Sequence, residues 1–186
     1  MFEQQHAASV DTFLADAYEH LQINYPKFYK MDNLSKAGVL GTEVLLNGRS
    51  LKDEYPPSGI AVVLSNASAS LDTDLKYEAS TRKIASPALF VYTLPNIVMG
   101  EICIRQGWKG ENGFFVFDKF DPLFMASYVD QVLTEGADAC LAGWIEIMGE
   151  RHNVFLYLVE NKNGMNALPH TAAQLTELYQ KALWTN

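Results

Sequence analysis

The chain has 186 residues, 48% of them hydrophobic, and 22 acidic against 14 basic side chains give it a net charge of −8. This length can bury a full core, so we expect one domain over residues 1–186. The negative charge disfavours nucleic acids and anionic membranes as partners, because both bind clustered positive charge. No apolar run approaches the ~20 residues of a membrane-spanning helix, and the first residues do not resemble a secretion signal.

The two cysteines, Cys103 and Cys140, stand in apolar surroundings without CxxC spacing. This pattern is typical of buried free thiols in a reducing compartment, so we expect a cytoplasmic location. The four histidines have no metal-ligand spacing, and we expect no metal site. We also expect no cofactor, because the sequence has neither a phosphate-binding glycine loop nor a Gly-x-Ser-x-Gly elbow.

The first third of the chain predicts two helices. Ser9 is a suitable cap for an amphipathic helix that should end near Tyr25, since proline at the next position disfavours helical geometry. A second helix should run from a cap at Asp32 to about residue 46. Its inner face carries Gly38 and Gly41, which cost helix propensity and indicate that another element packs closely there.

The middle of the chain predicts a strand followed by helices. Residues 59–65 form a continuous apolar run, which is typical of a buried strand. Residues 70–82 indicate a helix with acidic residues in its first turns. Residues 86–107 indicate a helix interrupted at Pro95. That last segment is apolar nearly all round, so we expect it to lie between the sheet and another surface.

The second half alternates strands and helices. We predict strands over residues 113–118, 139–148 and 154–160, and helices over residues 121–135 and 169–184. The polar turn at residues 149–153 predicts that the last two strands form an antiparallel hairpin. The order of elements favours an α/β fold, a three-layer α/β/α sandwich around a mixed sheet.

Four runs of the sequence stand out by their order and spacing: Tyr29–Leu46, Ser65–Ser80, Ser86–Asn112 and Glu135–Ile147. Together they resemble the N-terminal half of the β-ketoacyl synthases, which have the thiolase-like fold. The matching runs cover somewhat over half of the chain. The resemblance implies a single β-ketoacyl synthase N-terminal-like domain over residues 1–186, in a pathway of fatty-acid or polyketide type.

The chain departs from this family at the nucleophile. The resemblance implies a turn at Asp118, Lys119, Phe120 and Asp121 where the family carries its acyl-accepting cysteine, at about the position of Lys119. A lysine flanked by two carboxylates stays protonated and has no paired base, so it is not a substitute nucleophile. We expect no catalytic residue here. Lys119 either fills the former acyl site or presents a charge to a partner.

The strand before this turn is apolar on both faces. In the synthases this strand pairs with its two-fold mate, so the resemblance implies a homodimer, or a heterodimer with a ketosynthase-like subunit, through residues Gly113, Phe114, Phe115, Val116 and Phe117. An unpaired apolar edge promotes aggregation, and we therefore expect this strand to be covered.

An acyl pocket is predicted around the Pro95 break, with Phe90, Tyr92 and Met99 as its candidate lining. Acyl carrier proteins are acidic and would be repelled by a chain of net charge −8. The only basic clusters are Arg82-Lys83 and the pair Arg105 and Lys109, so any carrier protein contact is expected to be indirect, through a catalytic partner.

The leading interpretation is a non-catalytic β-ketoacyl-synthase-like protein, an interaction subunit similar to a chain length factor. Two alternatives remain open. The first is a divergent acyl-transfer enzyme, a ketosynthase or thioesterase relative that uses Asp118, Asp121 or Cys140. The second is a free-standing acyl-binding domain. A buried, unreactive Cys140 would count against the enzyme.

Overall fold

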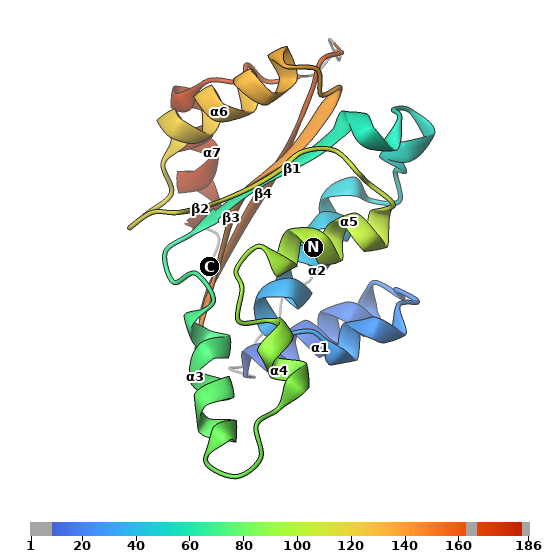
Figure 1. Cartoon of the computed structure of the whole chain (residues 1–186). Helices are drawn as coiled ribbons and strands as arrows, with labels where there is room; N and C mark the ends of the chain where they lie inside the picture. Colours follow the sequence, from blue (N-terminus) through green and yellow to red (C-terminus); the bar gives the residue numbers. More distant parts are fainter. Residues whose placement is uncertain (1–8, 163–166, 184–186) are drawn as a thin grey trace.

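The computed structural model of the protein describes residues 9–162 and 167–183. Within them, four strands form one mixed sheet in the order β2-β1-β3-β4 (Figure 1). Strand β1 is parallel to both β2 and β3, and β3 is antiparallel to β4. The strands are β1 (Ile60–Asn66), β2 (Asn112–Val116), β3 (Ala139–Met148) and β4 (Arg151–Glu160).

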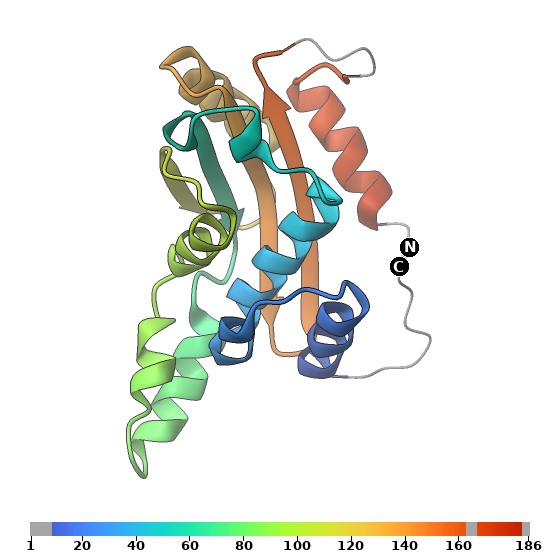
Figure 2. The same ribbon diagram turned by 90° about the vertical axis from the view of Figure 1, so that its right-hand side faces the viewer.

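Helices cover both faces of this sheet, as predicted for a three-layer α/β/α sandwich. Helices α2 and α5 lie on one face with α1 packed against α2, and α6 and α7 lie on the other (Figures 1 and 2). Helices α3 and α4 extend beyond the carboxyl end of β1. The helices are α1 (Val10–His20), α2 (Asn33–Leu46), α3 (Leu71–Thr81), α4 (Pro87–Val91), α5 (Ile97–Gln106), α6 (Pro122–Thr134) and α7 (Ala172–Leu183). Short 3-10 turns occupy Pro26–Lys30, Leu51–Asp53 and Pro57–Gly59. No helix in the described ranges is both long and apolar enough to cross a bilayer.

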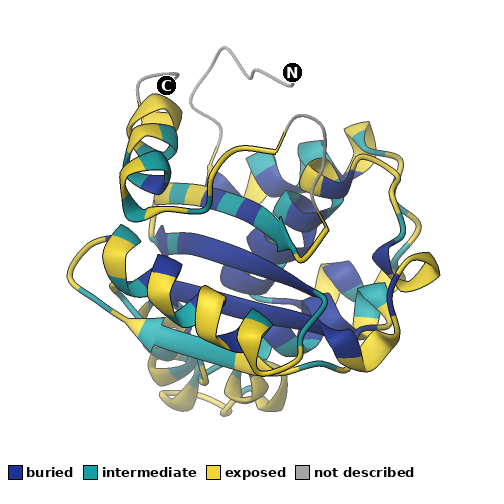
Figure 3. Ribbon diagram, turned by 90° about the horizontal axis from the view of Figure 1, so that it is seen from above, coloured by how far each residue is buried: buried dark blue, intermediate teal, exposed yellow. Residues whose placement is uncertain are grey.

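The core consists of two apolar layers separated by the sheet. Successive side chains of a strand point to opposite faces, so Ile60, Val62 and Leu64 of β1 face the layer under α2 and α5, while Ala61 and Val63 face the layer under α6. All seven residues of β1 are buried (Figure 3). The prediction of a buried strand from its continuous apolar run is confirmed.

Close packing explains the two glycines of α2. The Asp32 carboxylate caps the helix by accepting the Ser35 N–H at 2.9 Å. A Cβ at Gly38 would overlap Val98 of α5, and one at Gly41 would lie 2.8 Å from Leu156 Cδ1 of β4. A larger residue at either position would force these side chains of α5 or β4 to shift, which agrees with the close packing that the sequence indicated.

Two element boundaries differ from those predicted. Helix α1 ends at His20 rather than near Tyr25, because Gln22 adopts a left-handed conformation with φ 52°. The hairpin turn is also shorter than predicted, since Met148 already pairs with Arg151. The polar residues 151–153, which the sequence assigned to a turn, are the first residues of β4.

One predicted location is wrong. The segment on the N-terminal side of Pro95 does not lie between the sheet and another surface: α4 has no buried residue, and Phe90 is 60% exposed. Helix α5, on the other side of Pro95, does pack on the sheet and on α2. Proline separates two short helices with different surroundings, which an apolar composition alone does not distinguish.

Candidate interaction surface

Strand β2 forms one edge of the sheet. It pairs with β1 along Val62↔Asn112 to Asn66↔Val116, and no other strand of the described chain borders it. Phe114 packs on the α5 side, while Phe115 and Phe117 pack on the α6 side. Both faces of β2 are therefore apolar, and its outer backbone edge has no partner strand within the described residues.

An aromatic cluster holds β2 against α6. Phe115 lies edge-on to Phe124 and to Tyr128, with ring centroids 4.7 Å apart in each pair. Phe117 lies edge-on to Phe124 at 5.0 Å. These are favourable aromatic geometries, and each pair adds about 0.5–1.5 kcal/mol beyond area burial. The edge strand is consequently held in place although only one neighbouring strand pairs with it.

Apolar side chains also face outward beside this edge. Val116, the last residue of β2, is 54% exposed, and Leu123 in the first turn of α6 is 71% exposed. A Cβ built on Gly113 would lie 3.3 Å from the Tyr128 ring, so this part of the edge is closely packed. Val116, Leu123 and the outer edge of β2 are called the β2 surface below.

A second apolar region lies on the same side of the molecule. Residues 71–94, with α3, α4 and their connection, form an arm that extends from the body at the carboxyl end of β1 (Figures 1 and 2). Its contacts within itself include the Tyr77 and Phe90 rings at 5.4 Å. Six of its large apolar side chains are exposed: Leu71, Leu75, Ile84, Phe90, Val91 and Leu94. Exposed apolar groups gathered in this way are typical of an interaction site.

The predicted nucleophile turn follows β2 directly. Asp118 and Lys119 are exposed, and Phe120 is buried against the rings of Trp144, Phe155 and Tyr179. Phe120, and not Lys119, is therefore the residue of the turn that enters the core. The exposed position of Lys119 agrees with a charge presented outward.

Asp121 completes the turn as the cap of α6. Its Oδ1 accepts the backbone N–H groups of Leu123 at 3.1 Å and Phe124 at 2.9 Å. Pro122 then occupies the first helical position, where the missing N–H costs no hydrogen bond within the helix. The carboxylate is engaged in this capping role, which leaves it poorly placed as a general base.

Neither cysteine is an activated nucleophile. Cys140 lies in β3 with no exposed surface, and burial raises the pKa of its thiol to about 12. Burial also raises the pKa of Cys103. A thiolate is the reactive form, so both thiols stay protonated at neutral pH. Cys140 points into the core, as its position within a strand indicated.

The three residues predicted to line an acyl pocket have different surroundings. Phe90 is exposed on the arm, whereas Tyr92 and Met99 are buried. The Tyr92 hydroxyl donates to Glu101 Oε1 at 3.0 Å, and the other carboxylate oxygen lies 2.7 Å from Lys27 Nζ. Burial, and then the Glu101 charge, raise the pKa of Tyr92. One pocket of the described chain, between α1, α2 and β4, is lined by other residues.

Sequence reasoning missed two carboxylates with structural roles. One is the buried Glu101, and the other is the half-buried Glu146 of β3, whose Oε2 accepts the N–H groups of Ala67 at 2.8 Å and Ser68 at 3.2 Å. The Ser68 hydroxyl also donates to Glu146. These bonds fix the turn between β1 and the arm. A single acidic residue inside an otherwise apolar helix or strand was the available signal in both cases.

One arginine of each basic cluster forms an ion pair with a neighbouring glutamate. Arg105 Nε lies 2.8 Å from Glu43 Oε1, and Arg82 lies 3.3 Å from Glu78. In the described part of the chain, no group of three or more His, Cys, Asp or Glu side chains is arranged to hold a metal ion. His170 instead pairs with Asp130, Nδ1 to Oδ1 at 2.7 Å. His6 lies outside the described residues.

No family model matches the chain, and no curated protein sequence does either. Solved structures do match. "The ishigamide ketosynthase/chain length factor" aligns with a TM-score of 0.65 and 19% identity over 78% of this chain and 48% of that one. A "ketosynthase (ApeO) in complex with its chain length factor (ApeC)" from Xenorhabdus doucetiae aligns with a TM-score of 0.58 and 15% identity over 87% and 74%.

The chain has the α/β fold of these ketosynthase and chain length factor structures. This agrees with the thiolase-like fold that the sequence runs implied. The chain spans about half the length of the first of the two structures. At identities below 20% the likeness extends to the fold, and function has to be argued from the surfaces of this chain.

Proposed function

We propose that the protein is a non-catalytic interaction subunit, similar to a chain length factor, that pairs with a ketosynthase-like subunit in biosynthesis of fatty-acid or polyketide type. One observation carries the proposal: an apolar edge strand, held by an aromatic cluster, has no partner strand in the described chain. Such an edge is normally paired or covered in a native protein. A two-fold pairing of β2 would cover it.

The arm supports the same proposal. The arm lies on the side of the sheet that β2 borders (Figure 2) and carries exposed apolar residues, so one partner can cover both regions. Phe90, which the sequence placed in an acyl pocket, would face that partner. Both matched structures are described as combining a ketosynthase with a chain length factor, which favours a heterodimer over a homodimer.

The chemistry of the turn supports a role without catalysis. Where the resemblance places a nucleophilic cysteine, this chain has an exposed lysine next to a buried phenylalanine and a capping aspartate. The buried, protonated Cys140 gives the alternative of an acyl-transfer enzyme no accessible thiolate. We place the subunit in the cytoplasm, because both thiols are free.

Association tests the proposal directly. The full chain, alone and co-expressed with a ketosynthase-like protein from the same genome, is analysed by light scattering at micromolar concentration. We expect a dimer in each case, with the heterodimer favoured when both chains are present. Val116→Lys places a charge in the interface and should weaken association about 100-fold, which corresponds to about 2.7 kcal/mol.

A matched charge on the opposite edge strand provides the control. His152 is exposed on β4, and His152→Lys should leave association unchanged. A chain that stays monomeric both alone and with the ketosynthase-like protein would contradict the proposal. Equal weakening by the two lysine variants would show that the β2 surface is not the interface.

A further inference from the structure

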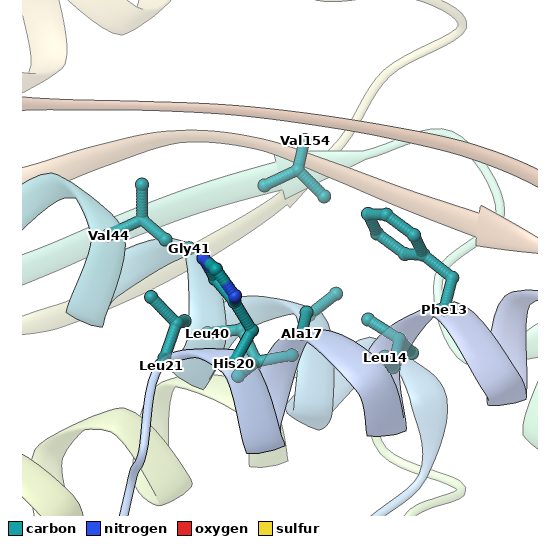
Figure 4. A pocket seen from close by; sticks show the side chains of 10 residues that line it. Phe13, Leu14, Ala17, His20, Leu21, Leu40, Gly41, Val44 and Val154 are labelled. Carbon is teal, nitrogen blue, oxygen red and sulfur yellow. The ribbon is translucent and has the colours of Figure 1, made fainter. Parts of the chain in front are cut away.

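A pocket of about 350 Å³ opens between α1, α2 and β4, beside the opposite edge of the sheet from the β2 surface (Figure 4). Leu14 and Leu40 form buried parts of its wall. His20, Val44 and Val154 form its exposed rim. Neither the sequence resemblance nor the proposed interface assigns a role to this pocket.

Helix α1 forms a fixed wall of the pocket, because it is attached near both ends. At its start, the Val10 N–H donates to Glu150 Oε2 in the β3–β4 turn at 2.9 Å. Near its end, the Tyr18 ring stacks on Phe28 with centroids 4.2 Å apart. Between these attachments, Ala17 presents only a methyl group to the pocket. The space therefore results from a small side chain on a firmly held helix.

The lining selects the kind of ligand. Of its ten residues, nine have hydrocarbon side chains or none, and His20 at the rim is the only one with a polar side chain. A polar ligand would lose its hydrogen bonds to water here and regain few of them. The volume lies at the lower end of the range of about 300–1,000 Å³ for ligand sites, which is enough for the alkyl chain of a small amphiphile.

We propose that this pocket binds the alkyl chain of a small amphiphile, such as a fatty acid or an acyl thioester. The chain lies between α1 and β4, in contact with Leu40 and Ala17, and the polar head stays at the rim beside His20. Apolar cavities of this kind take up apolar ligands readily because water gains few partners in them. The site lies away from the β2 surface, so it is separate from the proposed subunit pairing.

Binding of a fluorescent fatty acid to the full chain tests the site. Dansyl-undecanoic acid is titrated, and we expect saturable 1:1 binding with a fluorescence increase. Decanoic acid, decanol and the decanoyl thioester of N-acetylcysteamine are then compared as competitors. Competition by all three would identify the alkyl chain as the recognised part, and a preference among them would identify the natural head group. Butyrate should compete poorly because it fills little of the pocket.

Variants locate the binding. Ala17→Phe fills the pocket from α1, and Val44→Glu places a carboxylate at the rim. Each should weaken dye binding at least about tenfold, the scale of two unburied methylene groups. Leu45→Glu is the matched control, because Leu45 is the next residue of α2, is 37% exposed and does not line the pocket. Circular dichroism confirms that each variant is folded.

Three outcomes would overturn the inference. The first is the absence of saturable binding of the dye. The second is equal dye affinity in Val44→Glu and the parent chain. The third is cross-linking of a diazirine-labelled fatty acid to the arm or to β2 instead of α1 and α2. Association is measured on the same samples. Val44→Glu should still dimerise, and Val116→Lys should still bind the dye, so failure of this inference and failure of the proposed subunit role give different results.

Discussion

The two edge strands of the sheet differ in charge and in side-chain polarity. Strand β4 begins with the polar residues Arg151, His152 and Asn153 and ends at Glu160, which is paired with Arg49. Strand β2 has no charged residue, and apolar side chains occupy both its faces. Charged edges resist pairing with other chains, whereas apolar ones favour it. The sequence protects one edge and leaves the other available to a partner.

The two edges are also held by different means. Strand β4 continues the β3 hairpin through ten paired positions, from Met148↔Arg151 to Ala139↔Glu160. Strand β2 has five paired positions along β1 and depends on α6 and on the segment before it. Long local pairing makes β4 part of the most stable unit, so β2 is expected to open first in local unfolding. Perturbations near β2 should therefore affect association more than those near β4.

The largest effect is expected at Gly110, which precedes β2. A Cβ at this position would overlap the Ile60 carbonyl of β1, so Gly110→Ala must displace the start of β2. We expect it to lower the free energy of unfolding by about 3 kcal/mol, within the range of severe steric substitutions. Urea unfolding measures this loss, and hydrogen exchange should show lost protection first in β2.

Gly100→Ala is the control for this substitution. Gly100 lies in α5, and nothing lies within 4 Å of a Cβ built there. Alanine should therefore stabilise the protein by up to about 1 kcal/mol through helix propensity. The two glycine variants are expected to shift the urea midpoint in opposite directions. If both variants shift the urea midpoint in the same direction, the close approach of the segment before β2 to β1 does not account for the effect of Gly110→Ala on the free energy of unfolding.

A smaller effect is expected at the cap of α6, the helix that holds β2 through the aromatic cluster. Asp121→Ala removes the acceptor of two backbone N–H groups and should cost about 1 kcal/mol. Asp118→Ala, in the same turn, is the control. Because Asp118 is exposed, the free energy of unfolding of this variant should stay within about 0.5 kcal/mol of the parent chain. Urea unfolding compares the two variants. If the two variants lose the same free energy of unfolding, the capping hydrogen bonds of Asp121 do not stabilise α6.

Much of the fold follows from local chemistry. The continuous apolar run predicted β1, the Asp121-Pro122 pair predicted the start of α6, and the glycines of α2 predicted its close packing. Each of these features depends on residues that are close in sequence or on a close packing for which small residues are the local signal. The hairpin was predicted for the same reason. Its boundary was not, since polar residues pair as readily as apolar ones where a strand extends past the core.

The surfaces were harder to predict, because exposure depends on where a segment lies and not on its composition. Phe90 and Met99 occur in one apolar stretch, yet the first is exposed and the second buried. The buried Glu101 is compatible with its apolar helix only because Lys27 and Tyr92 approach from elsewhere. The pocket beside α1 requires β4 to pack beside α1 and α2, from which it is far apart in the sequence, and no local pattern predicts it.

The smallest effect is expected at the protected edge. The Arg49 guanidinium, and also the Tyr55 hydroxyl, hold the pKa of Glu160 below its usual value. The carboxylate is thus more acidic in the folded chain than in the unfolded one, where its pKa is about 4.3. Its contribution to stability is complete above that value and is lost as the pH falls through the folded pKa.

Glu160→Gln should lower the free energy of unfolding by up to about 1 kcal/mol at pH 7, as expected for a partly exposed ion pair. Urea unfolding at several pH values should show the difference from the parent chain shrinking in acid. If the free energies of unfolding of the two chains change in parallel with pH, the charge of Glu160 does not stabilise this edge. The contrast with β2 would then depend on side-chain polarity alone.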